Sequence, residues 1–221
     1  LLLRVPKTAS SSMLELDIFT RTVFPDVVKD YFEFRPCRKK TEVYRLDRQK
    51  DKIMYFRTRR HLNVMNHVDT LFNIHKNNIF TFGFVRNPFD RAISSWKFNN
   101  RNNKSAEVSF LQFCRKLESV DLLPESGIAE DDQLLHACEQ HPFLICEERN
   151  IKANFIGRFE NLQQDFDIVC DKMSVERQQL PHVNRTNHKH YTEYYNDESK
   201  EIIMKKYNRD FELFGYTFGD K

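Results

Sequence analysis

A turn of small hydroxyl residues near the start of the chain could bind an anion. Residues 6–12 read Pro-Lys-Thr-Ala-Ser-Ser-Ser and follow an apolar run at residues 1–5. Helically spaced apolar residues come next, so the pattern predicts a buried strand, a turn and then a helix. Such a turn directs free backbone N–H groups and the positive end of a helix dipole at one place, where Lys7 adds a charge. A serine-capped helix with a solvated Lys7 is the alternative.

A second candidate anion site follows the most strand-like segment, residues 79–85. Arg86 would lie at the carboxyl end of this strand, where ligands bind to open α/β sheets. Pro88 suits the first position of a helix, and Ser94 comes about two turns into that helix on a similar face. Arg86 and Ser94 could therefore hold one phosphate together. A local ion pair between Arg86 and Asp90 is the alternative.

Further strands and helices are expected to alternate along the chain. We expect strands at residues 53–56, 143–146 and 153–157, helices at 110–117 and 131–138, and an exposed loop at 99–107. Asn161 offers a side-chain cap for another helix, with Gln164 three residues on. A last helix begins near Asp197 and ends at Gly215. This order predicts an α/β fold: a single P-loop-like domain over residues 1–221, with a mainly parallel sheet flanked by helices on both faces.

The composition is that of a globular domain with no sign of a polyanion partner. Hydrophobic residues make up 40% of the 221 and charged residues 30%, with a net charge of only +3. The dense basic stretches at 38–40 and 57–60 can be solvated faces. No apolar run approaches the ~20 residues that span a bilayer. We therefore expect no nucleic-acid partner and no membrane segment within this chain.

Five scattered cysteines favour reduced thiols over a disulfide framework. They favour a cytoplasmic location, with a disulfide between Cys138 and Cys146 as the alternative in a secretory lumen. A Golgi lumen would fit if an anchor had been removed upstream of Leu1.

The two motifs, in this order and spacing, resemble the sulfotransferases that use 3′-phosphoadenosine 5′-phosphosulfate (PAPS), particularly the carbohydrate-type and bacterial members. The likeness continues in residues 155–162, in 181–195 and in Phe214-Gly215-Tyr216. It implies that PAPS and its product 3′-phosphoadenosine 5′-phosphate bind here. The implied nucleotide-binding residues are Arg4, Pro6, Lys7, Thr8, Ala9, Ser10, Ser11 and Ser12 in the first loop, Arg86 and Ser94 for the 3′-phosphate, and Arg158, Arg185 and Lys189.

The resemblance also implies how the reaction would proceed. Lys7 corresponds to the family's loop lysine, which contacts the oxygen between phosphate and sulfate and stabilises its developing charge. The acceptor would be a hydroxyl, of a saccharide or a polar small molecule, and needs a base. His61 is the expected base because it lies between the two motifs, with His67 as the fallback. No metal is required, and His182, His188 and His190 do not have the spacing of metal ligands.

The first loop departs from the family at one point. A glycine is usual where this chain reads Ala9-Ser10, and Ser10 would be strained if its φ had to be positive. Two alternatives follow from the residues: a P-loop-like nucleotide kinase, and a non-catalytic domain that binds nucleotides or polyanions. The kinase is disfavoured because the loop has no glycine, which the pattern Gly-x-x-x-x-Gly-Lys-Ser/Thr requires.

Overall fold

A small parallel sheet organises the part of the chain that the computed structural model describes. That part comprises residues 2, 3, 5, 7–9, 13, 32–35, 45–48, 80–102, 107–119, 134–146, 151–181 and 189–220. The strands β1 (Leu2–Leu3), β4 (Phe82–Val85) and β7 (Phe155–Arg158) form one sheet in the order β1-β4-β7. Both pairings are parallel, with Leu3 opposite Gly83 and Val85 opposite Arg158. The expected α/β class is confirmed.

Two further strand pairs are antiparallel and do not belong to this sheet. The strand β2 (Phe32–Arg35) pairs with β3 (Arg45–Arg48), and β5 (Ile145–Cys146) pairs with β6 (Ile151–Lys152). The strand expected at 53–56 lies outside the described residues.

The helix α5 (Pro88–Asn102) continues directly from β4. The Asn87 side chain caps it, because its Oδ1 accepts the Phe89 N–H at 3.0 Å. Pro88 fits the first turn, and Asp90 and Arg101 complement the helix dipole at the two ends. The sequence therefore places α5 at the carboxyl edge of the sheet.

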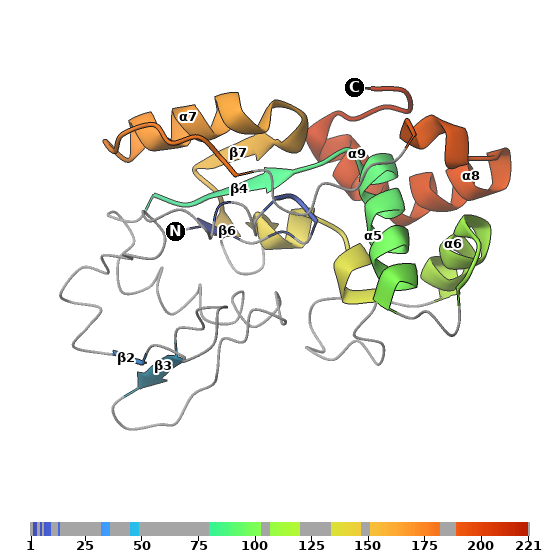
Figure 1. The fold of residues 1–221 in the computed structure, drawn as a ribbon, viewed down its shortest axis with the longest axis horizontal. Coiled ribbons are helices and arrows are strands. Elements are labelled where there is room, and N and C mark those ends of the chain that lie inside the picture. Colours follow the sequence, from blue (N-terminus) through green and yellow to red (C-terminus); the bar gives the residue numbers. More distant parts are fainter. Residues whose placement is uncertain are drawn as a thin grey trace.

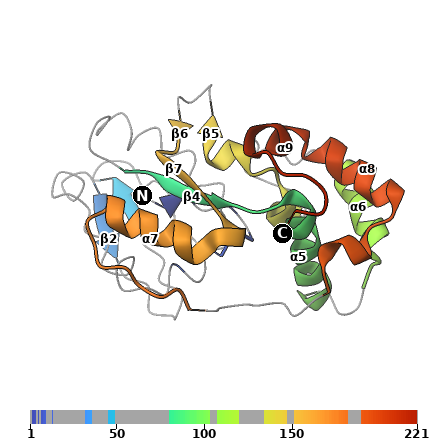
Figure 2. The same cartoon turned by 90° about the horizontal axis from the view of Figure 1, so that it is seen from above.

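The remaining helices gather around α5 or cover the sheet (Figure 1). They are α6 (Phe110–Ser119), α7 (Leu162–Lys172), α8 (Asp197–Lys206) and α9 (Asn208–Phe214). Short 3₁₀ helices cover Leu134–Ala137 (η3), His141–Phe143 (η4), Phe159–Asn161 (η5) and Tyr191–Tyr194 (η6). The view from above shows α7 running along β4 and β7, while α5, α6 and α8 stand together at the other end (Figure 2).

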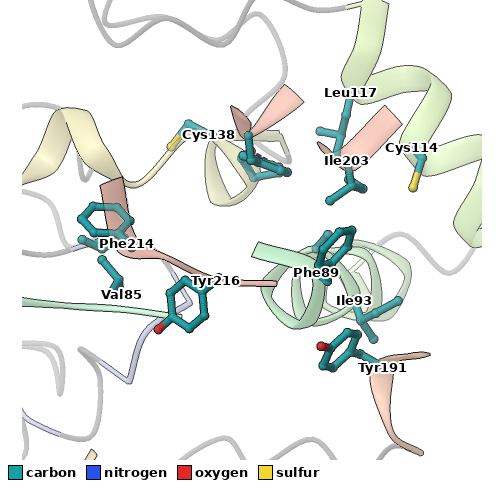
Figure 3. Close-up of a cluster of buried hydrophobic side chains, with 14 of the residues drawn as sticks. Val85, Phe89, Ile93, Cys114, Leu117, Cys138, Tyr191, Ile203, Phe214 and Tyr216 are labelled. Carbon is teal, nitrogen blue, oxygen red and sulfur yellow. Dashed lines mark hydrogen bonds between the residues drawn. The ribbon is translucent and has the colours of Figure 1, made fainter. Parts of the chain in front are cut away.

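Two hydrophobic clusters fix this arrangement. In the larger one, Phe89 and Ile93 of α5 pack among side chains of α6, α8 and the C-terminal segment (Figure 3). In the smaller one, Phe82 and Phe84 pack against Phe166 and neighbouring residues of α7. The alternation of β4 explains the division, because Phe82 and Phe84 point to one side while Val85 joins the larger cluster.

Polar residues 99–102 continue α5 instead of forming the expected loop. The Asn100 side chain exchanges hydrogen bonds with the Val108 backbone, donating to its carbonyl at 2.8 Å and accepting its N–H at 3.3 Å. The Trp96 indole donates to the same carbonyl at 2.8 Å. These tertiary hydrogen bonds stabilise the helical conformation at the polar end of α5.

The helix expected at 131–138 is a 3₁₀ helix over its described part, residues 134–137. Side chains bind its last carbonyls: Ser95 donates to His136 O at 3.0 Å, and Tyr207 donates to Ala137 O. The strand expected at 143–146 is confined to 145–146, because residues 141–143 form η4.

The expected side-chain cap at Asn161 is also wrong. Asn161 ends η5 and leads into α7 without a capping hydrogen bond from its side chain. The single last helix expected from Asp197 to Gly215 is instead two helices, α8 and α9, which meet at Tyr207. The start at Asp197 and the left-handed Gly215 after α9, with a φ of 65°, are as expected.

The loop after β1 contains left-handed backbone at two residues that are not glycine. The φ angles are 66° at Lys7 and 61° at Ala9, while Ser10 lies outside the described residues. Such angles cost an L-residue roughly 1–2 kcal/mol. The Met13 N–H donates to the Ala9 carbonyl at 3.3 Å, which is the i to i−4 hydrogen bond of an α-helix, and Met13 itself is helical.

The close packing of Gly157 yields a first prediction. A Cβ at this position would lie 2.5 Å from an atom of the Phe84 ring and 3.0 Å from the Asp165 Cβ. Because β4 pairs with β7 at this point, the ring cannot move away without disturbing the smaller cluster. We expect Gly157→Ala to lower the free energy of unfolding by about 1–3 kcal/mol, measured by chemical denaturation. A loss within experimental error would contradict the packing described here.

The strain at Ala9 yields a second prediction. We expect Ala9→Gly to raise the free energy of unfolding by about 0.5–1 kcal/mol, because glycine adopts a positive φ without steric cost. Ala92→Gly is the matched control, since Ala92 is a buried residue inside α5 and the same change should destabilise there. Equal destabilisation by both changes would show that Ala9 is unstrained.

Candidate functional site

The carboxyl edge of the parallel sheet brings together basic residues from three separate segments. Lys7 follows β1, Arg86 follows β4, and Arg158 ends β7. Since Val85 is opposite Arg158 and all pairings are parallel, the strands leave the sheet on the same side. This is the edge where open α/β sheets bind ligands.

Lys7 is half-buried and its ammonium faces an aromatic ring rather than solvent. Its Nζ lies 4.4 Å from the centroid of the Phe98 ring. Burial, and then the positive charges of Arg86 and Arg101, lower the pKa of Lys7 to about 8. Within the described part of the chain, no carboxylate forms an ion pair with Lys7. The alternative of a solvated Lys7 is therefore wrong.

Arg86 forms the local ion pair that the sequence offered as an alternative, but that pair does not use all of its donors. Its Nε and Nη2 donate to one Asp90 oxygen at 2.8 and 2.7 Å. Its Nη1 donates to the Lys7 carbonyl at 3.4 Å, and the guanidinium lies 4.2 Å from the Phe159 ring centroid. A guanidinium has five N–H donors, so Nη1 and Nη2 each keep one N–H beyond these bonds.

The backbone of Arg86 is fixed by a buried amide. Gln140 accepts the Arg86 N–H through Oε1 and donates to the Arg86 carbonyl through Nε2, both at 2.9 Å. The Gln140 N–H in turn donates to Asp210, whose side chain is fully buried and also accepts from His141. Arg86 is thereby held from a segment 54 residues away.

The next residue, Asn87, joins β4 to the C-terminal segment. Its N–H donates to Glu160 Oε1 at 2.8 Å, and its side-chain amide donates to the Thr217 carbonyl at 3.2 Å. The other Glu160 oxygen accepts the Tyr216 hydroxyl at 2.8 Å. Burial, together with the Glu160 carboxylate, raises the pKa of Tyr216 well above its usual value, so the hydroxyl remains a donor.

The hydroxyl residues of the two motifs have different environments. Thr8 is buried, and its Oγ1 donates to the Val5 carbonyl at 2.9 Å, so this hydroxyl closes the turn. Ser94 is buried on α5, eight residues after Arg86. The structure thus assigns Thr8 a role in shaping the loop, whether or not it also contacts a ligand.

Arg158 and Lys189 were the expected contributors from the second half of the chain. Arg158 donates to the Phe214 carbonyl at 2.6 Å and lies 4.5 Å from the Tyr216 ring centroid, beside the Glu160 contacts. Lys189 is exposed, and its described ion partner is Glu193 at 3.4 Å. The structure therefore brings Arg158 into contact with the C-terminal segment that also binds Asn87.

Several expected site residues lie outside the described part of the chain: Arg4, Pro6, Ser10, Ser11, Ser12, His61, His67 and Arg185. Their roles stay predictions.

The structure also adds residues that the sequence did not single out. Phe98 and Arg101 follow Ser94 by four and seven residues, so helical spacing could have placed them on the same face. Nothing in the sequence connects Gln140 or Asp210 with Arg86, because their contacts arise only from tertiary packing.

Other kinds of site find no support among the described residues. They contain no group of three or more His, Cys, Asp or Glu side chains placed to hold a metal ion. None of the helices they form is long and apolar enough to cross a membrane. Cys138 is a buried cysteine outside any disulfide, so the alternative disulfide with Cys146 is not formed.

Comparison with known proteins gives the family. A model of the Sulfotransferase family matches residues 1–217. Carbohydrate sulfotransferase 10 of Xenopus laevis is 25% identical over 170 residues, which is 63% of this chain and 48% of that protein. The chain thus spans about half the length of this relative. No solved structure matches. Because the family model covers nearly the whole chain, the protein belongs to the sulfotransferase family.

Proposed function

We propose that this chain transfers a sulfuryl group from PAPS to a hydroxyl of a saccharide. One observation carries the proposal: Lys7 presents a half-buried ammonium, with no carboxylate partner in the described part of the chain, beside Arg86 at the carboxyl edge of the sheet. Burying a cation without an anion is costly, and a bound anion would offset that cost. Family membership identifies sulfuryl transfer as the chemistry that this site would serve.

The donor set suits a nucleotide that carries two separate anionic groups. Lys7 and the strained turn at residues 7–9 would hold the 5′-phosphosulfate, aided by Ser10, Ser11 and Ser12. Arg86 and Ser94 would hold the 3′-phosphate, with Asp90 keeping the Arg86 guanidinium and Gln140 the Arg86 backbone in place. Arg158, Arg185 and Lys189 would make further contacts with the nucleotide. The protein's own groups thus supply positive charge at both ends of the ligand.

Lys7 would act on the leaving oxygen. When bound, the nucleotide supplies the sulfuryl group, which moves to the acceptor oxygen as the bond from sulfur to the phosphate oxygen breaks. The ammonium stabilises the electron pair left on that phosphate oxygen. Because the pKa of Lys7 is about 8, most of the ammonium is protonated at neutral pH and can do so.

The acceptor hydroxyl must lose a proton as its oxygen attacks. We assign this proton to His61, because imidazole is a side chain suited to accept a proton near neutral pH, with His67 as the fallback. The saccharide acceptor rests on the name of the Xenopus relative, a carbohydrate sulfotransferase. We further propose that residues 1–221 act as one P-loop-like domain.

Lys7→Ala tests the catalytic assignment. We expect transfer from PAPS to fall by about 10²–10³-fold, because one preorganised charge on the leaving oxygen is lost. The rate would be measured as release of 3′-phosphoadenosine 5′-phosphate in the presence of a panel of saccharides. Lys97→Ala is the matched control, since Lys97 is also a lysine that lies over an aromatic ring, at 5.0 Å from Tyr194, and it should keep the wild-type rate.

Two outcomes would contradict different parts of the proposal. A Lys7→Ala protein that transfers at the wild-type rate would contradict the role of Lys7. A wild-type protein that binds the nucleotide but transfers to no acceptor would favour the non-catalytic binding domain instead.

A further inference from the structure

One face of α5 extends the site beyond Ser94. Asp90, Ser94, Phe98 and Arg101 follow one another at spacings of four, four and three residues, so they share one side of the helix. Asp90, at the start of this row, binds Arg86. Phe98, further along, contacts the Lys7 ammonium at 4.4 Å. Lys7 therefore lies along this row, because its backbone carbonyl contacts the Arg86 guanidinium that Asp90 binds and its ammonium lies over Phe98.

Two of the described cations oppose the Lys7 ammonium. Arg86 and Arg101 both repel it, and the Asp90 carboxylate is bound to Arg86. The Arg101 guanidinium also lies over the Phe98 ring, at 5.6 Å from the centroid, and the His136 ring packs 4.6 Å from it. Among the groups described here, the π face of Phe98 is what attracts the ammonium electrostatically.

We propose that Phe98 is the positioning residue of Lys7. Its ring holds the ammonium in the site until an anionic ligand binds the ammonium in place of the ring. A carboxylate in the same place would bind the lysine more strongly and would repel an incoming phosphate or sulfate. A neutral ring attracts the cation without opposing the ligand. Phe98 thereby keeps Lys7 oriented and charged in a pocket of like charges. The identity of the ligand rests on the proposed function, whereas the contact itself does not.

The test measures the protonation of Lys7 in the protein without nucleotide. The rate at which acetic anhydride labels Lys7 would be followed by mass spectrometry between pH 6 and 10, with Lys97 as the internal reference. The variants are Phe98→Leu, which keeps an apolar side chain but removes the π face, and Phe98→Trp, which restores a stronger one.

We expect the midpoint for Lys7 to fall in Phe98→Leu by about half to one pH unit below the wild-type value, since the ring favours the charged form. At pH 7, labelling of Lys7 relative to Lys97 should then be about three to five times faster. Phe98→Trp should return the midpoint to the wild-type value or above it. A purely space-filling Phe98 would instead leave the midpoint unchanged in Phe98→Leu, or raise it as water enters, and either result would overturn the proposal.

Calorimetry on the same proteins distinguishes this inference from the proposed function. If the midpoint does not fall while 3′-phosphoadenosine 5′-phosphate binds the wild type, the role of Phe98 is wrong and the nucleotide site stands. If the midpoint falls but the nucleotide does not bind, Phe98 positions Lys7 and the assigned ligand is wrong.

Discussion

The parallel pairing of β4 with both of its neighbours is the constraint on which the rest of the site depends. Because β1, β4 and β7 run in the same direction, the segments that follow them emerge together and bring Lys7, Arg86 and Phe159 into contact. Two cations that meet at a partly buried edge repel each other. The Asp90 carboxylate and the rings of Phe98 and Phe159 offset this repulsion. A buried framework of hydrogen bonds also restricts the movement of Arg86.

That framework buries several polar groups, and each of them needs a hydrogen-bond partner to be stable there. Gln140 uses both ends of its amide on the Arg86 backbone, and Asp210 is a fully buried carboxylate that accepts N–H groups from Gln140 and His141. Removing any one partner would leave a buried polar group unsatisfied, at a cost of about 1–3 kcal/mol. On the opposite side, Glu160 and the C-terminal segment hold Asn87. The backbone of the Arg86 motif is thus fixed from both sides, as binding to one rigid anionic group requires.

The sequence predicted the parts of this site that local signals encode. An apolar run that ends in a polar turn marks a strand end, so Lys7 and Arg86 could be placed at the same edge before any contact was known. The helix starts at Pro88 and near Asp197 and the glycine after α9 were equally local. Contacts over long sequence separations could not be predicted: the Gln140 amide lies 54 residues from Arg86, and Phe98 is 91 residues from Lys7. The expected loop at 99–107 was wrong over residues 99–102 for the same reason, since the Val108 backbone binds the polar end of α5 only in the folded chain.

Calorimetric titration with 3′-phosphoadenosine 5′-phosphate and with adenosine 5′-phosphate, which lacks the 3′-phosphate, tests the central claim most directly. The wild type should bind the first nucleotide at least about tenfold more tightly than the second, because Arg86 contributes charge-assisted hydrogen bonds. Arg86→Ala should lose this difference, while Arg115→Ala, which removes an exposed arginine paired with Glu198, should retain it. No binding by the wild type at high micromolar concentration, or equal affinity for the two nucleotides, would contradict the assignment of this edge as the site for a 3′-phosphorylated nucleotide.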